Sequence, residues 1–321
     1  MNETMMKKIV SYAAWPLLVF GTLFSVYRLI GIGIGPISVM APITLITFLI
    51  VTYLEFKFPF KKGWGPNKQQ MKIDLTHFVF TELSNQLIFR QLAVILIAAF
   101  GYQINQDLVA RGPWILLGLN QLHPAIQILI SMAALDLMLY WQHRLMHEVP
   151  WLWKLHSVHH SADGMSALNA IRNHLLGPIV TSGLTLVFSF LGQSAEVYFT
   201  TLSFIVIKGW LQHANVDLKT GLLDYLFMTP NNHRWHHSTE DVPGNSNFGL
   251  ITPFWDFVPW HRVPFLGRML SIQRRTFYRD ALREAPEEVG IKDHKIDSKK
   301  SSFQIWLDQM FSPFKRTGER V

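Results

Sequence analysis

The sequence predicts an all-α integral membrane protein: a helical bundle of about four transmembrane helices, a possible re-entrant hairpin and a helical cap on the cytosolic side. Three observations support this fold class. Apolar residues make up 49% of the 321 residues and lie in long blocks, which is typical of membrane proteins. Lysine and arginine residues flank these blocks instead of forming one basic face. After the fourth block the chain alternates short polar and apolar segments that are rich in histidine.

Four segments are long enough to cross a bilayer, which requires about 20 apolar residues. They run from about Ile9 to Ile30, Ile37 to Phe56, His77 to Tyr102 and Ile126 to His147. The first segment resembles a signal peptide, but its apolar run is too long and no small-residue cleavage site follows it. We therefore expect it to be a retained span.

The third predicted span is mixed in character, because it includes Glu82, Asn85 and Arg90. Such residues are expected to face other helices and not lipid. Residues 175–210 form a further apolar stretch with polar interruptions around Gly192. This stretch either crosses the membrane twice or enters and returns as a re-entrant hairpin, and we favour the hairpin.

The distribution of positive charge predicts the orientation. The lysine-rich loop at residues 57–72 is expected on the cytoplasmic side. Even numbers of crossings then place the N-terminus, this loop and His143 onward on that side. The net charge of +7 is spread over span ends, where it contacts lipid headgroups, so we expect no nucleic-acid partner.

The chain divides into three predicted regions. Residues 1–125 form an N-terminal transmembrane region, residues 126–262 carry the histidine motifs, and residues 263–321 form a polar C-terminal tail. Within the tail, Phe303, Trp306 and Met310 share one helical face. This pattern predicts an amphipathic helix that lies on a surface.

Cysteine is absent, which removes disulfides, iron–sulfur clusters and thiolate metal sites. Histidine is abundant instead, with fourteen residues. Eight of them occur at spacings of three or four, which place side chains on one face of a helix. These groups are His143 and His147; His156, His159 and His160; and His233, His236 and His237, with His213 as a single further candidate.

The histidine groups predict a site for two metal ions. Imidazole nitrogen suits iron, zinc, copper and nickel. Eight or nine histidines exceed the four ligands of a tetrahedral zinc, but suit two ions of higher coordination number. One histidine on an apolar helix is usually structural, whereas burying eight imidazoles without metal would require a partner for every ring nitrogen. A His-Glu-x-x-His zinc peptidase is disfavoured, because Arg144 follows His143.

The motifs His-x3-His, His-x2-His-His and a distant second His-x2-His-His resemble the fatty acid hydroxylase and sterol desaturase superfamily, over about residues 135–260. Flanking segments match too: Arg172 and His174; Gln212 to Asn215; Asn247 to Gly249; and Trp255 with Asp256. Two segments depart from the family pattern. Phe257 to Trp260 stand where an aromatic-Gly-Thr segment is common, and Leu175 and Leu176 stand where Pro and Glu are common.

The resemblance implies a non-haem di-iron enzyme that hydroxylates or desaturates a lipid C–H bond with O2, with hydroxylation favoured. It implies electrons from a separate electron-transfer protein, because no fused haem carrier domain is recognisable. Carried over by position, the metal ligands would be His143, His147, His156, His159, His160, His213, His233, His236 and His237. His174 would be a ligand or would support one.

Asp136 is a candidate supporting residue, because it lies seven residues before His143 and shares its helical face. A carboxylate within a span is a functional-site hypothesis by default. It would either accept a ring N–H from a ligand histidine or make a structural hydrogen bond or a pair with Arg90.

A histidine-lined metal transporter or sensor is the alternative function. A transporter would spread polar ligands through the depth of several spans, whereas most histidines here follow the fourth span. The expected location is a bacterial inner membrane with the histidine site facing the cytoplasm, or the endoplasmic reticulum membrane in a eukaryote.

Overall fold

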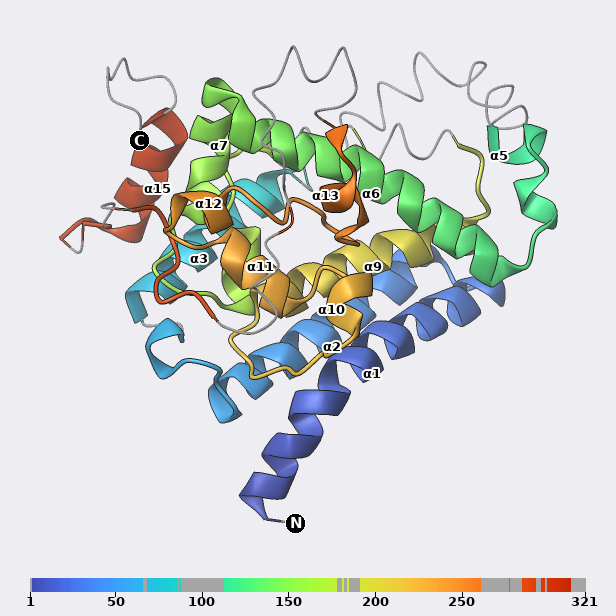
Figure 1. Ribbon diagram of the computed structural model, residues 1–321, viewed down its shortest axis with the longest axis horizontal. Helices are drawn as coiled ribbons and strands as arrows, with labels where there is room; N and C mark the ends of the chain where they lie inside the picture. Colours follow the sequence, from blue (N-terminus) through green and yellow to red (C-terminus); the bar gives the residue numbers. More distant parts are fainter. Residues whose placement is uncertain are drawn as a thin grey trace.

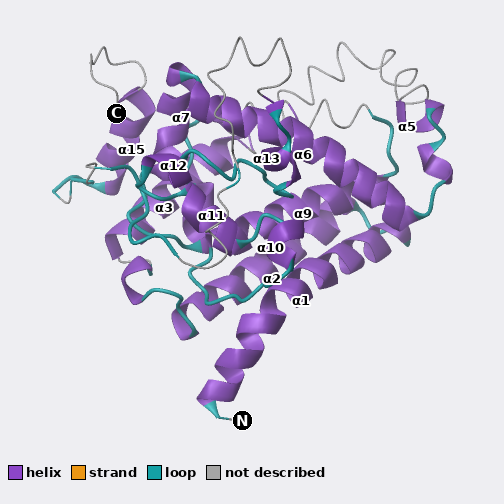
Figure 2. Ribbon diagram, in the orientation of Figure 1, coloured by secondary structure: helices purple, strands orange, loops and turns teal. Residues whose placement is uncertain are grey.

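The computed structural model describes residues 2–65, 68–85, 87, 113–177, 181, 184, 191–260, 277, 285–292, 296–297 and 299–312. In these residues the secondary structure is helical, with two isolated β-bridges and no strand (Figure 2). The predicted all-α fold class is therefore confirmed.

Within the described ranges, three helices are long and apolar enough to cross a membrane, as predicted for an integral membrane protein. They are α1 (Glu3–Gly31), α2 (Pro36–Lys57) and α6 (Pro124–Glu148), and their bounds lie close to the first, second and fourth predicted spans. Their outer faces expose large apolar side chains, including Leu17, Phe24 and Ile37, as lipid contact requires.

The third predicted span, from about His77, begins at the last residue of α3 (Lys68–His77) and continues into the π-helical segment η2 (Phe78–Leu83). The rest of this span, apart from residues 84, 85 and 87, lies outside the described residues. Most of residues 178–190 lie outside them as well, so the re-entrant hairpin stays a prediction. The second half of that apolar stretch forms α9 (Ala195–His213).

Helix α9 is the centre of the bundle, and it contacts α1, α2 and α6 (Figure 1). Its buried Phe204 and Leu211 pack against Trp15 of α1 and Val51 of α2 in the main apolar cluster. Side chains that are apolar on several faces of a helix favour such a central position. This core fixes the direction in which the C-terminal end of α9 presents His213.

The remaining helices form the cap at one end of the bundle (Figure 1). They are α7 (Pro150–His160), α10 (Leu223–Leu226), α11 (Pro230–His236), α12 (Asp241–Gly244), α13 (Phe254–Phe257) and α15 (Ser302–Phe311), with the 3-10 segments η1 (Lys62–Trp64) and η5 (Ala167–Ile171). The far end of α6 is preceded by α5 (Pro113–Leu116) and η4 (Leu119–Gln121).

Proline starts three of the helices that carry histidines, because α6, α7 and α11 each have proline in the first turn. Proline is favoured there, since its missing N–H would be unpaired anyway. Pro150 also prevents α6 from continuing into α7. The chain therefore turns after Glu148, and α7 starts on a new axis beside the end of α6.

The amphipathic segment near the C-terminus forms α15, which packs on α3. Its Ile305 and Met310 are buried, whereas Phe303 and Phe311 stay exposed. The buried stripe on this helix is thus covered by protein, and its relation to a bilayer surface stays a prediction.

Candidate metal centre

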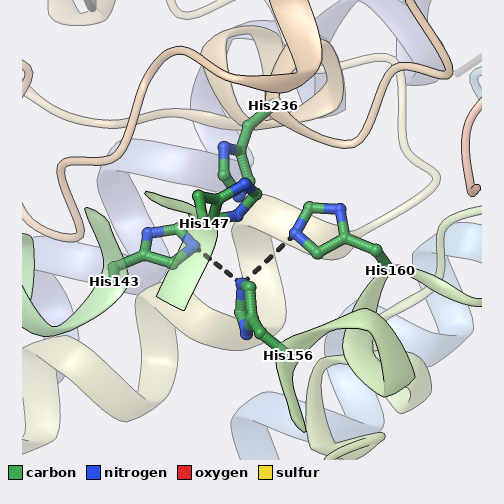
Figure 3. A group of neighbouring side chains, drawn as sticks. All are labelled: His143, His147, His156, His160 and His236. Atoms are coloured by element: carbon green, nitrogen blue, oxygen red, sulfur yellow. Dashed lines mark hydrogen bonds between the residues drawn. The ribbon is translucent and has the colours of Figure 1, made fainter. Parts of the chain in front are cut away.

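The nine histidines expected as ligands lie in two compact groups in the cap. The His143 cluster comprises His143, His147, His156, His160 and His236. The His213 cluster comprises His159, His213, His233 and His237. Within each cluster the ligand nitrogen atoms lie within 4.8 Å of one another, and Figure 3 shows the five rings of the His143 cluster directed toward one another.

Helices α7 and α11 each contribute to both clusters. His156 and His160 point into the His143 cluster, while His159 points into the His213 cluster. Helix α11 contributes His236 to the His143 cluster and His233 to the His213 cluster. The clusters are adjacent, since the rings of His160 and His237 stack with centroids 4.3 Å apart.

Backbone carbonyl oxygens orient several of these rings. His143 Nδ1 lies 2.8 Å from the Phe248 oxygen, and His236 Nδ1 lies 2.8 Å from the Ser246 oxygen. His159 Nδ1 lies 3.2 Å from the Arg172 oxygen. Because a carbonyl oxygen only accepts hydrogen bonds, Nδ1 must carry the proton in each ring. In the neutral imidazole this leaves a lone pair on Nε2, the atom that faces the cluster.

The Nε2 atoms then meet in pairs that cannot hydrogen-bond to each other. His213 Nδ1 donates to the Gly209 oxygen at 3.0 Å, and His159 donates to Arg172, so neither Nε2 carries a proton. These two Nε2 atoms are nevertheless only 3.1 Å apart. Two facing lone pairs repel, and a cation between them converts the repulsion into two ligand bonds. The arrangement therefore fits a metal ion.

The spacing of the nitrogen atoms also suits metal ions. The Nε2 atoms of His143 and His156 are 3.1 Å apart, and those of His156 and His160 are 3.2 Å apart. Imidazole ligands about 2.1 Å from one ion, at right angles to each other, would be roughly 3.0 Å apart. His147 Nε2 and His236 Nε2 have no hydrogen-bond partner among the described residues. Both atoms belong to the group that surrounds the common centre.

Burial keeps the cap histidines neutral. Desolvation lowers the pKa of His156, His159 and His160 well below the usual imidazole value, and neighbouring imidazoles lower it further. The same causes, in the same order, lower the pKa of His233 and His237. The neutral form is the one that binds metal, so the site is ready for metal at neutral pH.

The segment after α12 positions the Phe248 carbonyl group that bonds to His143. Asp256 accepts hydrogen bonds from the backbone N–H groups of Phe248 and Gly249, at 3.0 and 2.8 Å. Asn247 has a φ of 57°, in the left-handed region that tight turns use. A Cβ added at Gly249 would lie 2.0 Å from the Thr252 oxygen, so only glycine fits. This tight turn aims the Phe248 carbonyl at His143.

Asp136 does not bond a ligand histidine, and the first expectation for its role is wrong. Its carboxylate accepts hydrogen bonds from the backbone N–H groups of Leu250, Ile251 and Thr252, at 3.2, 2.6 and 3.0 Å, and from the Thr252 hydroxyl at 2.8 Å. The structural alternative therefore holds. Asp136 acts at a distance, because it anchors the segment that directly follows Phe248.

His174 lies outside both clusters. Its Nε2 donates to the Met310 oxygen at 2.9 Å, and its Nδ1 accepts from the Leu176 N–H at 3.2 Å. Both ring nitrogens are thus engaged by groups other than the clustered histidines, so His174 is no ligand in this arrangement. It instead ties the segment after η5 to α15.

Two buried charged residues near the site were not singled out from the sequence. Glu55, at the end of α2, accepts hydrogen bonds from the backbone N–H groups of Ala167 and Asn215, both at 2.8 Å. Lys208 of α9 is 1% exposed. A charged residue inside an apolar segment was the available signal in both cases.

Comparison with known proteins agrees with the motifs. Residues 128–259 match the fatty acid hydroxylase family model. An ornithine lipid hydroxylase of Rhizobium tropici is 29% identical over 218 residues, which cover 66% of this chain and 63% of that protein. Human alkylglycerol monooxygenase is 31% identical over 117 residues, 36% of this chain and 26% of that protein. Sphinganine C4-monooxygenase 1 of Arabidopsis thaliana is 27% identical over 196 residues, 60% of this chain and 71% of that protein.

The match spans less than two thirds of the length of the first two of these relatives. No solved structure is significantly similar to the chain.

Proposed function

We propose that this protein is a membrane-bound oxidoreductase that hydroxylates a C–H bond of a lipid with O2. The match of residues 128–259 to the fatty acid hydroxylase family model supports this proposal. The observation that carries the proposal is the pair of adjacent histidine clusters at one end of α6. Neutral imidazoles without carboxylates suit iron, zinc or copper. The monooxygenase name of a relative disfavours redox-inactive zinc, and the resemblance of the histidine motifs to a di-iron superfamily favours iron over copper.

The proposed centre holds one iron ion in each cluster. Five histidines would hold the first ion and four would hold the second, so each ion keeps an open coordination position. When bound, the metal pair supplies the reduction of dioxygen and the removal of hydrogen from carbon. For each lipid R–H, the balanced reaction consumes O2, two electrons and two protons and releases R–OH and water.

The protein's own groups orient the ligands and exclude water. Backbone carbonyls of Phe248, Arg172 and Ser246 hold rings so that their Nε2 atoms face the clusters. Seven of the nine histidines are buried and two are half-buried. Exclusion of water protects a strong oxidant from side reactions.

The lipid substrate is expected to arrive from the bilayer. His143 and His147 lie in the last turns of α6, a helix apolar enough to span a membrane. The relatives are named for ornithine lipid, alkylglycerol and sphinganine, so we propose a lipid with a polar headgroup. These names also favour hydroxylation over desaturation.

We also propose the electron donor, the side of the membrane and the division of the chain into regions. Electrons would come from a separate electron-transfer protein, and the site would face the cytoplasm of a bacterial cell. Residues 126–262 would form the catalytic region, between the N-terminal membrane region at 1–125 and the tail at 263–321. The metal transporter alternative is disfavoured, because the clustered ligands lie within one compact site and do not line the depth of the bundle.

The test combines metal analysis with isotope transfer. The full chain, purified in lipid nanodiscs, should contain about two iron ions and consume O2 only with a reductant. Membranes from cells that express it, supplied with ¹⁸O2, should accumulate a lipid heavier by one labelled oxygen atom. A double variant, His147→Ala with His237→Ala, serves as the inactive control. Full metal loading without reductant-dependent O2 uptake or label transfer would contradict the proposal.

A further inference from the structure

Lys208 stands out as a buried cation beside the metal centre. It lies on α9 one turn before Gln212, whose Nε2 is 3.1 Å from His233 Nε2. Residues four apart share a helical face, so Lys208 faces the same interior. Its side chain is 1% exposed, in a helix that is otherwise largely apolar.

The Lys208 amine lacks a hydrogen-bond acceptor in the part of the chain that the structure describes. Asp136 is the carboxylate with which it interacts electrostatically, but their charged atoms are not within ion-pair distance. The Asp136 oxygens are instead taken by residues 250–252. Burying an amine without an acceptor is costly, and a bound anion would supply the missing acceptor and stabilise the charged form of Lys208.

Lys208 lies on the same helix as one clustered histidine and on a neighbour of the helix that carries another. It precedes His213 by five residues on α9, and α9 contacts α6, which carries His143. The two clusters adjoin where the rings of His160 and His237 stack. The amine therefore lies on the helix that leads directly into the two adjoining clusters.

The charge balance of this region favours an anion. All nine clustered ligand groups are neutral histidines, and neither cluster contains a carboxylate. Two divalent ions would add four positive charges and Lys208 a fifth, against the single carboxylate of Asp136. A bound metal is often the largest local charge in a site, and here little protein charge compensates it.

Building on the proposed function, we propose that Lys208 Nζ and the metal centre together bind a small anion, with the ammonium donating a hydrogen bond to it. The class of ligand comprises two- or three-atom anions and hydroxide, to which the reduced forms of dioxygen belong. Lys208 would thereby hold the reacting oxygen in place.

The experiment uses azide as the probe and cobalt as a metal that does not turn over. The full chain is loaded with Co²⁺, and azide binding is followed by the visible absorption of the metal. Lys208→Met should weaken azide binding about tenfold or more, while Lys208→Arg should stay within about threefold of the parent. Lys219→Met, which removes an exposed lysine, is the matched control and should change nothing.

Imidazole is a neutral metal ligand, so it tests whether the effect of Lys208→Met depends on the negative charge of the added ligand. It should bind the parent and Lys208→Met equally, because the hydrogen bond to an anion is then irrelevant. Equal azide affinity in the two proteins, or an equal loss for azide and imidazole, would overturn the inference. If Lys208→Met fails to hold cobalt, Lys208→Gln replaces it and should weaken azide binding but not imidazole binding. Failure of the parent itself to bind cobalt would instead count against the proposed function.

Discussion

Backbone carbonyl groups decide which ring nitrogen is protonated in several histidines of the cap. Each ring whose Nδ1 donates to a backbone oxygen must present an unprotonated Nε2. Helical spacing alone would not have selected this nitrogen. The hydrogen bond chooses the tautomer, and the tautomer makes the imidazole a ligand.

Loss of one clustered histidine should remove one metal ion. His159→Ala leaves three ligands in the His213 cluster, so iron content should fall from about two ions per chain to about one, and hydroxylation should drop about 100-fold or more. Metal analysis and label transfer measure the two effects. His174→Gln is the matched control, since His174 is buried but lies outside the clusters. An iron content that responds equally to both substitutions would refute the ligand assignment.

Asp136 should matter for stability. Asp136→Ala would leave the buried N–H groups of Leu250, Ile251 and Thr252 without their acceptor, at a cost of about 1–3 kcal/mol each. The thermal unfolding temperature in detergent should therefore fall strongly. Asp163→Ala, at an exposed carboxylate, should leave it nearly unchanged. Comparable unfolding temperatures for the two variants would show that the anchor is unimportant.

At the scale of elements, the cap is organised by helix ends. Pro150 stops α6 and starts α7, so that these two helices bring their histidines to the same centre from different directions. Helix α15 then closes over the second histidine motif. Gln309 bonds His77 Nε2 at 2.8 Å and the Ser161 hydroxyl at 2.9 Å, and Trp306 donates to Thr81.

Gln309 is accordingly expected to hold α15 in place. Gln309→Leu keeps the size of the side chain but removes both hydrogen bonds, and should destabilise the protein by about 1–3 kcal/mol. Chemical denaturation in detergent gives this value. Asp308→Asn on the same helix weakens a surface ion pair with Lys300 and should have a small effect. A larger effect of Asp308→Asn would argue against this docking.

For the molecule as a whole, the spans determine where the site lies. The start of α6 and its histidine end are separated by 25 residues of helix, which is long enough to cross a bilayer. The predicted orientation places the histidine end and the N-terminus on the cytoplasmic side.

Orientation can be measured cleanly, because the chain has no cysteine. Single cysteines at Lys8 and Lys299 should react with a membrane-impermeant maleimide only from the cytoplasmic side. A cysteine at Asn120, just before α6, should react only from the opposite side. Labelling of positions 8 and 120 from one side would contradict the predicted topology.

The stability of the metal-free protein should depend on pH. The pKa values of His156, His160 and His236 are lowered well below the usual imidazole value by burial and by neighbouring imidazoles. In the unfolded chain these groups titrate near about 6.5, so below that pH the unfolded state binds more protons than the native state. The free energy of unfolding should therefore be highest above pH 6.5 and fall toward pH 5. Stability that stays constant or rises over this interval would contradict the neutral cluster.

The sequence by itself determined the long spans of α1, α2 and α6 and the identity of the candidate ligands. Hydropathy and helical spacing are local properties, and local properties can be read along the chain. The family motifs are also local, which is why the match over residues 128–259 was predictable.

The tertiary structure alone decided which histidines share a cluster, what Asp136 binds and where Lys208 lies. Spacing fixes the direction of a side chain relative to its own helix axis, but not the angle and offset at which two helices meet. His159 and His160 are neighbours in sequence, yet α7 directs them into different clusters, because their side chains leave the helix about 100° apart. Only the packing of α6, α7, α9 and α11 brings each ring to its partners.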